Sequence, residues 1–184
     1  MEVLGKTMDD AAGEAFDKSA KILGLSYPGG PLIDKFSKGG NPNAFQFGIG
    51  KVLGLAFSFS GFKTSVLYLV RDKMEEEATF IQNNMSDICA SIQFTIVNYL
   101  LSKLKKAAKH TGIKHIALAG GVSANSELRD KFERLAVEEK WKSYIPAFEY
   151  CTDNAAMIAC AGYYKMLRGE ISPMNVLSFA SIKV

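Results

Sequence analysis

Two short apolar segments, each followed by a helical one, give the second half of the sequence its pattern. Residues 113–119 and 144–150 have the length and composition of strands, the first of them buried, and residues 126–140 and 152–167 have helical patterns. Consecutive parallel strands need a long crossover connection, so this order favours an α/β architecture with at least two parallel strands. We predict that residues 111–184 form the α/β portion of the chain.

Residues 1–110 are mostly helical and read as a short first strand followed by a helix-rich insert. Residues 2–7 alternate weakly and predict a strand, and residues 9–23 predict a helix capped by Asp9 or Asp10. The longest helix is expected at residues 81–110, because its isoleucines recur at helical spacing.

Three other segments complete the expected layout of this half. Residues 27–31, YPGGP, predict a rigid turn, because proline fixes φ and glycine permits positive φ. Residues 38–50 predict a loop rich in Gly and Asn. Residues 57–62 alternate like a strand and precede a helix expected at residues 63–73.

Composition limits the class of protein more than it identifies one. The formal net charge is +3, which permits contact with nucleic acid without predicting it. The three cysteines have no C-x-x-C spacing, which favours a reducing, cytoplasmic setting over a disulfide framework. We expect neither a signal peptide after Met1 nor a membrane span, because no run of eighteen apolar residues exists.

Histidines and lysines give only weak indications of a site. His110 and His115 are five residues apart across a Thr-Gly break, so they do not share a helical face as a metal pair would. Four lysines crowd the end of the longest predicted helix, where they either form a solvated face or contact phosphate. These are Lys103, Lys105, Lys106 and Lys109.

Candidate binding residues lie at predicted helix starts. Glycines 120 and 121 follow a strand and precede a helix, where free N–H groups can meet an anionic or polar ligand. Asn125 is either a ligand-binding amide or an ordinary N-cap. Asp10, Glu14 and Asp17 share one helical face, and the helix dipole explains Asp17 less well because it lies past the first turn.

Asp153 is an isolated carboxylate at the start of the last predicted helix. Taken alone it is best interpreted as an N-cap. A metal site needs three or four protein ligands, and the neighbours of Asp153 in the sequence supply none of the others.

Five segments in order resemble the universal tRNA threonylcarbamoyl-adenosine transferase family, once called O-sialoglycoprotein endopeptidases. They are DDAAGEAFDK at 9–18, YPGGP at 27–31, FSFSGFKT at 57–64, AGGVSAN at 119–125 and CTDNAAMIA at 151–159. The resemblance covers essentially the whole chain but only about the C-terminal half of the family's usual length. It implies the C-terminal lobe of an actin-like, sugar-kinase and Hsp70-type fold, in which two α/β lobes close over a nucleotide.

The resemblance also implies an activity. The family moves a threonylcarbamoyl group from threonylcarbamoyl-adenylate to N6 of the adenosine that follows the anticodon in tRNA. It works with other subunits of a threonylcarbamoyl-transfer complex. By resemblance, this chain contributes nucleotide contacts from Asp17, Gly30, Asp34 and Asn125, with Glu14 in support, and no catalytic residue.

A divalent metal, iron or zinc, is implied by the same resemblance. Two histidines of an H-x-x-x-H motif, which the resemblance places upstream of Met1, hold it together with the aspartate of the C-T-D-N motif, here Asp153. We expect this chain by itself to bind the metal weakly or not at all.

Two other functions stay open at this point. The chain could be a non-catalytic paralogue that binds the transferase, although its retained site residues argue against that. A metallopeptidase is least favoured, since no nucleophile–base pair is indicated. The resemblance further makes residues 2–7 the third strand of a β-meander, and the unpaired edge of such a strand predicts a homodimer.

Overall fold

The computed structural model describes residues 2–50 and 52–177. They form two compact units, the first ending at Cys151 and the second beginning at Thr152. The boundary that the sequence predicts at residue 110 lies within the first unit and stays a prediction. Among the described residues, no helix is both long and apolar enough to cross a membrane.

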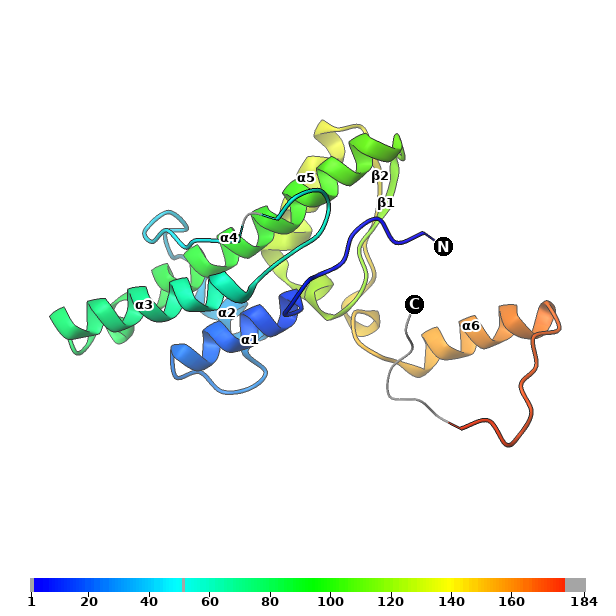
Figure 1. The fold of residues 1–184 in the computed structure, drawn as a ribbon, viewed down its shortest axis with the longest axis horizontal. Coiled ribbons are helices and arrows are strands. Elements are labelled where there is room, and N and C mark those ends of the chain that lie inside the picture. Colours follow the sequence, from blue (N-terminus) through cyan, green and yellow to red (C-terminus); the bar gives the residue numbers. More distant parts are fainter. Residues whose placement is uncertain (1, 51, 178–184) are drawn as a thin grey trace. The chain divides into compact units, whose positions relative to one another are not determined.

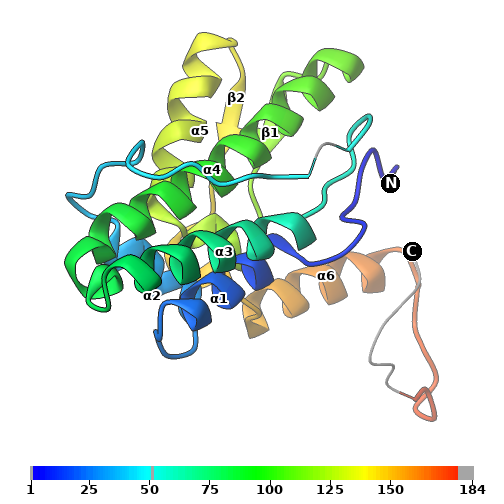
Figure 2. The same cartoon turned by 60° about the vertical axis from the view of Figure 1, so that its left-hand side comes forward.

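Four helices build most of the first unit (Figures 1 and 2). They are α1 (Ala12–Ile22), α2 (Gly29–Phe36), α3 (Ser60–Glu76) and α4 (Phe80–Thr111). Helix α1 packs against α2 and α3, and α4 packs against α2 and α3. Their shared core is rich in aromatic and branched side chains, among them Phe16, Ile33, Phe59, Phe62, Ile88 and Ile92.

The helical pattern of the first half is confirmed because apolar residues at helical spacing do face this core. In α1, Ala15, Phe16 and Ala20 are buried, and Gly24 ends the segment with a φ of 75°. Helix α4 spans the predicted range and contains one non-helical residue, Asn84.

The second core of the first unit joins the C-terminal half of α4 to a small sheet and a fifth helix. Strands β1 (His115–Ala117) and β2 (Lys142–Tyr144) pair in parallel, with Ile116 opposite Ser143. Helix α5 (Ser126–Glu138) buries Leu128 and Phe132 against α4. The chain is therefore α/β and helix-rich, with a two-stranded parallel sheet, as the sequence predicts in coarse outline.

The predicted strands 113–119 and 144–150 are wrong in extent. Only Ile116 of β1 is buried, β2 is exposed throughout, and residues 148–150 form a 3₁₀ turn. The apolar composition of residues 113–119 predicts a buried strand, which holds only for Ile116. With one neighbour each in the described sheet, the strands keep only three paired residues apiece.

Two further strand predictions in the first half are also wrong. Residues 2–7 form no strand, and only Thr7 makes an isolated parallel bridge to Phe57. Residues 57–62 do not form a strand either, because α3 already begins at Ser60. A strand needs a hydrogen-bonded neighbour, and these two segments offer each other a single bridge.

The second unit contains α6 (Ala155–Leu167). Its N-cap is Asn154, whose side chain accepts a hydrogen bond from the Met157 amide at 2.9 Å. Interpreting Asp153 as the N-cap was therefore wrong by one residue. An amide oxygen at position 154 satisfies the free N–H that the carboxylate at 153 was expected to meet.

Candidate nucleotide-binding site

Asp17 of α1 holds the start of α2. Its Oδ1 accepts hydrogen bonds from the backbone N–H of Gly29 at 2.7 Å and of Gly30 at 3.2 Å. The first N–H groups of a helix have no partner inside the helix, so a carboxylate from another helix satisfies them and complements the dipole. The residues are twelve and thirteen positions apart, and the fold brings them together.

Gly29, at the start of α2, is required by close packing. A Cβ added to Gly29 would lie 2.4 Å from the Ala20 Cβ and 3.0 Å from the Asp17 Cα. The prediction of a turn over 27–31 is therefore wrong in its second half, where α2 has already begun. Pro31 is tolerated there because the first helical turn leaves its N–H groups free in any case.

Asp34, on the same helix, reaches the start of α5. Its Oδ1 accepts a hydrogen bond from the Ser126 hydroxyl at 2.6 Å, and its Oδ2 accepts one from the Ser126 amide at 3.3 Å. Asp34 therefore joins two helices that lie 92 residues apart in sequence. Helix α2 contacts Asp17 at its first turn and Ser126 further along.

Asn125 is both a structural cap and a buried amide. Its Oδ1 accepts a hydrogen bond from the Leu128 amide at 2.9 Å, which confirms the N-cap interpretation. Its Nδ2 donates to the Gln93 Oε1 at 2.6 Å, and the residue is only 8% exposed. One N–H of the Asn125 amide is left for another acceptor, because a primary amide carries two.

All four predicted nucleotide residues therefore belong to one hydrogen-bond network. Asp17, Asp34 and Asn125 take part through their side chains, and Gly30 takes part through its backbone amide. Gln93 and Ser126 are the members that sequence reasoning missed. Gln93 left a signal, because it is a polar residue on the stripe that α4 buries with Cys89 and Val97. Ser126 left none beyond its place beside an N-cap.

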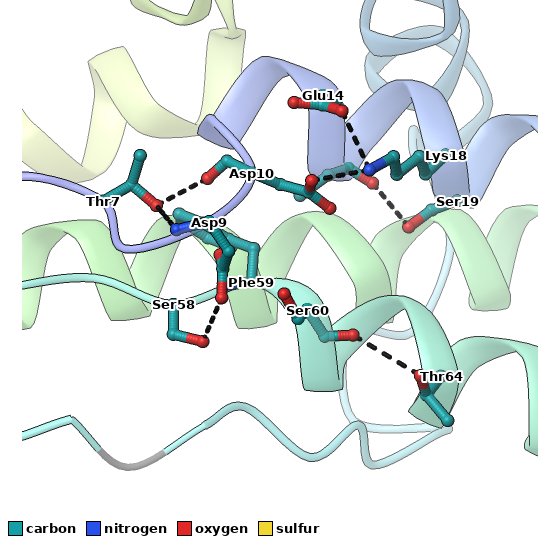
Figure 3. Close-up of polar contacts among 11 residues, drawn as sticks. Thr7, Asp9, Asp10, Glu14, Lys18, Ser19, Ser58, Phe59, Ser60 and Thr64 are labelled. Carbon is teal, nitrogen blue, oxygen red and sulfur yellow. Dashed lines mark hydrogen bonds and ion pairs between the residues drawn. The ribbon is translucent and has the colours of Figure 1, made fainter.

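The other carboxylates of the acidic face are engaged elsewhere. Asp10 and Glu14 both pair with Lys18, at 2.6 and 2.8 Å, and these contacts raise the pKa of the Lys18 ammonium (Figure 3). Lys18 therefore engages both Asp10 and Glu14, although its single charge offsets only one of their two, and Asp17 is the member of that face that contacts α2. Glu14 has an exposed side chain and no contact to α2 among the described residues.

Asp9 is a link to α3 and not a cap of α1. Its carboxylate accepts hydrogen bonds from the Phe59 amide at 2.7 Å and the Ser58 hydroxyl at 2.5 Å. These bonds favour the ionised form and hold the pKa of Asp9 well below its ordinary value. The predicted cap was wrong because the N-cap of α1 is Ala11, which has no side-chain oxygen.

The lysine cluster of α4 is only partly a solvated face. Lys103 is buried and donates to the carbonyl oxygens of Val52 and Gly54, at 2.9 and 2.8 Å, so it is not available to phosphate. Lys105 pairs with Glu139. The two histidines form no metal pair: His115 Nδ1 lies 3.1 Å from the Tyr144 hydroxyl.

Asp153 lies on the exposed segment before α6, one residue ahead of the N-cap. Across the described ranges, no group of three His, Cys, Asp or Glu residues could hold a metal ion. Asp153 supplies one carboxylate, whereas a metal site needs three or four protein ligands.

Comparisons with known proteins show which family the chain belongs to. A family model described as TsaD, tRNA N6-adenosine threonylcarbamoyltransferase, matches residues 1–160. The chain belongs to this family. A transferase of that name from Christiangramia forsetii is 56% identical over 183 residues, which are 100% of this chain and 54% of the relative.

Other relatives with the same name are similarly close. The protein from Porphyromonas gingivalis is 54% identical over 184 residues, covering 100% of this chain and 54% of the relative. The protein from Fervidobacterium nodosum is 50% identical, covering 94% and 51%. The chain therefore spans about half the length of the curated relatives it matches.

Proposed function

We propose that this chain forms the C-terminal lobe of an actin-like transferase and supplies its nucleotide contacts. The reaction would transfer a threonylcarbamoyl group from threonylcarbamoyl-adenylate to N6 of the adenosine following the anticodon in tRNA. Family membership supports the activity, and the joining of Asp17, Gly30, Asp34 and Asn125 through α2 supports the site. The observation that carries the proposal is the hydrogen bonding of Asp17 to the Gly29 and Gly30 amides.

The chemistry of these residues suits a nucleoside. Asp17 uses Oδ1 for the helix, and its Oδ2 has no hydrogen bond to any described residue, so it can accept one from a ribose hydroxyl. Gly30 has no side chain to separate a ring from the backbone. Asn125 retains an N–H donor beside the N-terminus of α5, where polar or anionic ligand atoms are favoured.

The alternative functions have less support. A non-catalytic paralogue would not need nucleotide contacts, whereas all four residues that the resemblance assigns to them are present in this chain. A peptidase would need an activated nucleophile. The buried Cys151 thiol is a candidate nucleophile by its chemistry. It contacts the Arg129 guanidinium and the Ala147 carbonyl, and it has no histidine partner within the described chain.

We expect adenine nucleotides to bind this chain weakly. One open lobe leaves much of a ligand in water, whereas good pockets bury most of it. Calorimetric titration with adenylate should give saturable binding that is lost in an Asp17→Ala, Asn125→Ala double variant. Unchanged binding in that variant would show that the site is misplaced.

We also propose that Asp153 is one metal ligand in a longer protein that contains the H-x-x-x-H motif. A bound iron or zinc ion would act there as a Lewis acid. In such a protein, Asp153→Ala should lower the metal content at least tenfold, because metal affinity depends steeply on ligand number. Elemental analysis tests this, with Glu149→Ala as the matched control.

The proposed partners are tRNA, the other subunits of the transfer complex and a second copy of this chain.

An apolar cavity supports the second copy. The cavity has a volume of about 670 Å³, lies in the first unit and is lined largely by apolar side chains from residues 2–5, α4 and the end of β1. Val3 and Leu4 are 55% and 41% exposed at its rim. An extended segment of a second copy would cover these apolar side chains.

Self-association is therefore expected at micromolar concentrations. Light scattering at several concentrations should show a dimer that weakens in a Val3→Asp, Leu4→Asp variant, because charge in an apolar interface is costly. A single monomer of about 20 kDa over the whole range would contradict the dimer.

A further inference from the structure

A ring of hydrogen-bonded residues joins α2, α4 and α5, and Gln93 is the member that α4 contributes. Gln93 Nε2 donates to the Ser37 Oγ at 3.0 Å, and its Oε1 accepts from the Asn125 Nδ2 at 2.6 Å. The Ser37 hydroxyl donates to the Asp34 carbonyl at 2.9 Å. The Asp34 carboxylate accepts from Ser126, which follows Asn125 and completes the ring.

The direction of every amide in the ring is set by one backbone group. The Leu128 amide can only donate, so Asn125 must turn its oxygen toward it. The Asn125 Nδ2 then faces Gln93, which must present its own oxygen in return. The Gln93 Nε2 is left to meet Ser37. No buried side-chain polar atom in the described residues lacks a partner, so the arrangement is self-consistent.

Burial makes this arrangement costly to change. Gln93 is 3% exposed and lies on the apolar stripe of α4. If its amide turned over, two N–H groups would face each other at Asn125, and water could not replace the lost bond. The Leu128 amide and Gln93 together therefore hold Asn125 with its oxygen turned to α5 and one N–H to spare for a ligand.

We infer that Gln93 is a positioning residue for nucleotide binding. It holds Asn125 as a hydrogen-bond donor and, through Ser37, ties the C-terminal end of α2 to the same site. The ligand group that Asn125 meets is then an acceptor, such as a ribose or phosphate oxygen. The identity of the ligand rests on the proposed function, whereas the orientation of Asn125 rests on the hydrogen bonds alone.

Three variants separate orientation from stability. Gln93→Met keeps the length of the side chain and removes both hydrogen bonds. Gln93→Glu keeps an oxygen for the Asn125 N–H but buries a charge, so it should be the less stable protein. Ser91→Ala removes another buried polar group of α4, which contacts Phe45 and Asn41 and not Asn125, and is the matched control.

Amide hydrogen exchange of Leu128 reports the orientation of Asn125 without any ligand. We expect about fivefold to tenfold faster exchange in Gln93→Met, corresponding to one lost hydrogen bond, and little change in Gln93→Glu and Ser91→Ala. Unchanged exchange in Gln93→Met would overturn the positioning role, even if the wild-type chain binds no nucleotide.

Calorimetry with adenylate tests the link to binding. We expect the affinity of Gln93→Met to fall about fivefold to tenfold and that of Gln93→Glu to stay near the wild type despite its lower stability. An affinity that follows thermal stability across the three variants would overturn the inference. Absence of binding in the wild type would instead refute the proposed function, while the exchange result would still decide the geometry.

Discussion

We expect the 184-residue chain alone to leave tRNA without detectable threonylcarbamoyl-adenosine. The chain spans 54% of relatives such as the Porphyromonas gingivalis transferase, and in the proposed fold its nucleotide face would be only one side of a cleft. Well-oriented reactants in a closed site reach effective molarities of about 10⁵ M or more, so one open face should leave the rate far below that of the full-length relative. Mass spectrometry of nucleosides from tRNA incubated with threonylcarbamoyl-adenylate measures the product.

The full-length relative is the positive control in this assay, supplied with the same substrates and partner subunits. The chain should stay at the background of a reaction without enzyme. Turnover by the chain alone would contradict the expectation if Asp153→Ala abolished it, because that residue would then work without the rest of the proposed metal site. Turnover that Asp153→Ala left unchanged would point to a contaminating enzyme.

Helices were predictable in this chain because their signal is local. Apolar residues three and four apart mark the buried faces of α1 and α4, and the core confirms them at Phe16, Ile88 and Ile92. The end of α1 at Gly24 was equally local, since the segment needs a residue with positive φ there.

Strands were not predictable to the same degree because their partners are distant. Residues 2–7 have a strand-like alternation, yet only Thr7 finds a bridge. Residues 144–150 have the apolar composition of a strand, yet pairing with β1 stops at Tyr144. Composition cannot show how many neighbours a strand will have, and that number decides how far it extends.

The site was predictable in its members and not in its contacts. The resemblance named Asp17 and Gly30, but nothing in the sequence indicated that one would bind the other's backbone across thirteen positions. Asn125 was weighed as a cap or as a ligand, and its two hydrogen bonds show that a cap can keep a donor to spare. Gln93 belongs to no motif and was found only through its contacts.

The double role of Asp17 leads to our last prediction, in which stability and binding separate. Asp17→Ala removes the acceptor from the Gly29 and Gly30 amides, and we expect a loss of about 1–2 kcal/mol in the free energy of unfolding, as for other lost helix caps. The melting temperature should fall by about 2–4 °C per kcal/mol in a chain of this size. Nucleotide binding should be lost as well.

Asp17→Asn keeps an oxygen for the two glycine amides but replaces the free Oδ2 with an N–H donor. We expect its melting temperature to lie near that of the wild type and its adenylate affinity to fall about tenfold or more, the cost of a hydrogen bond to a charged group. Lys21→Ala is the control on the same helix, because its exposed side chain has no hydrogen bond to any described residue and its loss should change neither quantity measurably. Wild-type affinity in Asp17→Asn would show that the carboxylate serves the helix alone, and the ribose contact would then have to be assigned to another residue.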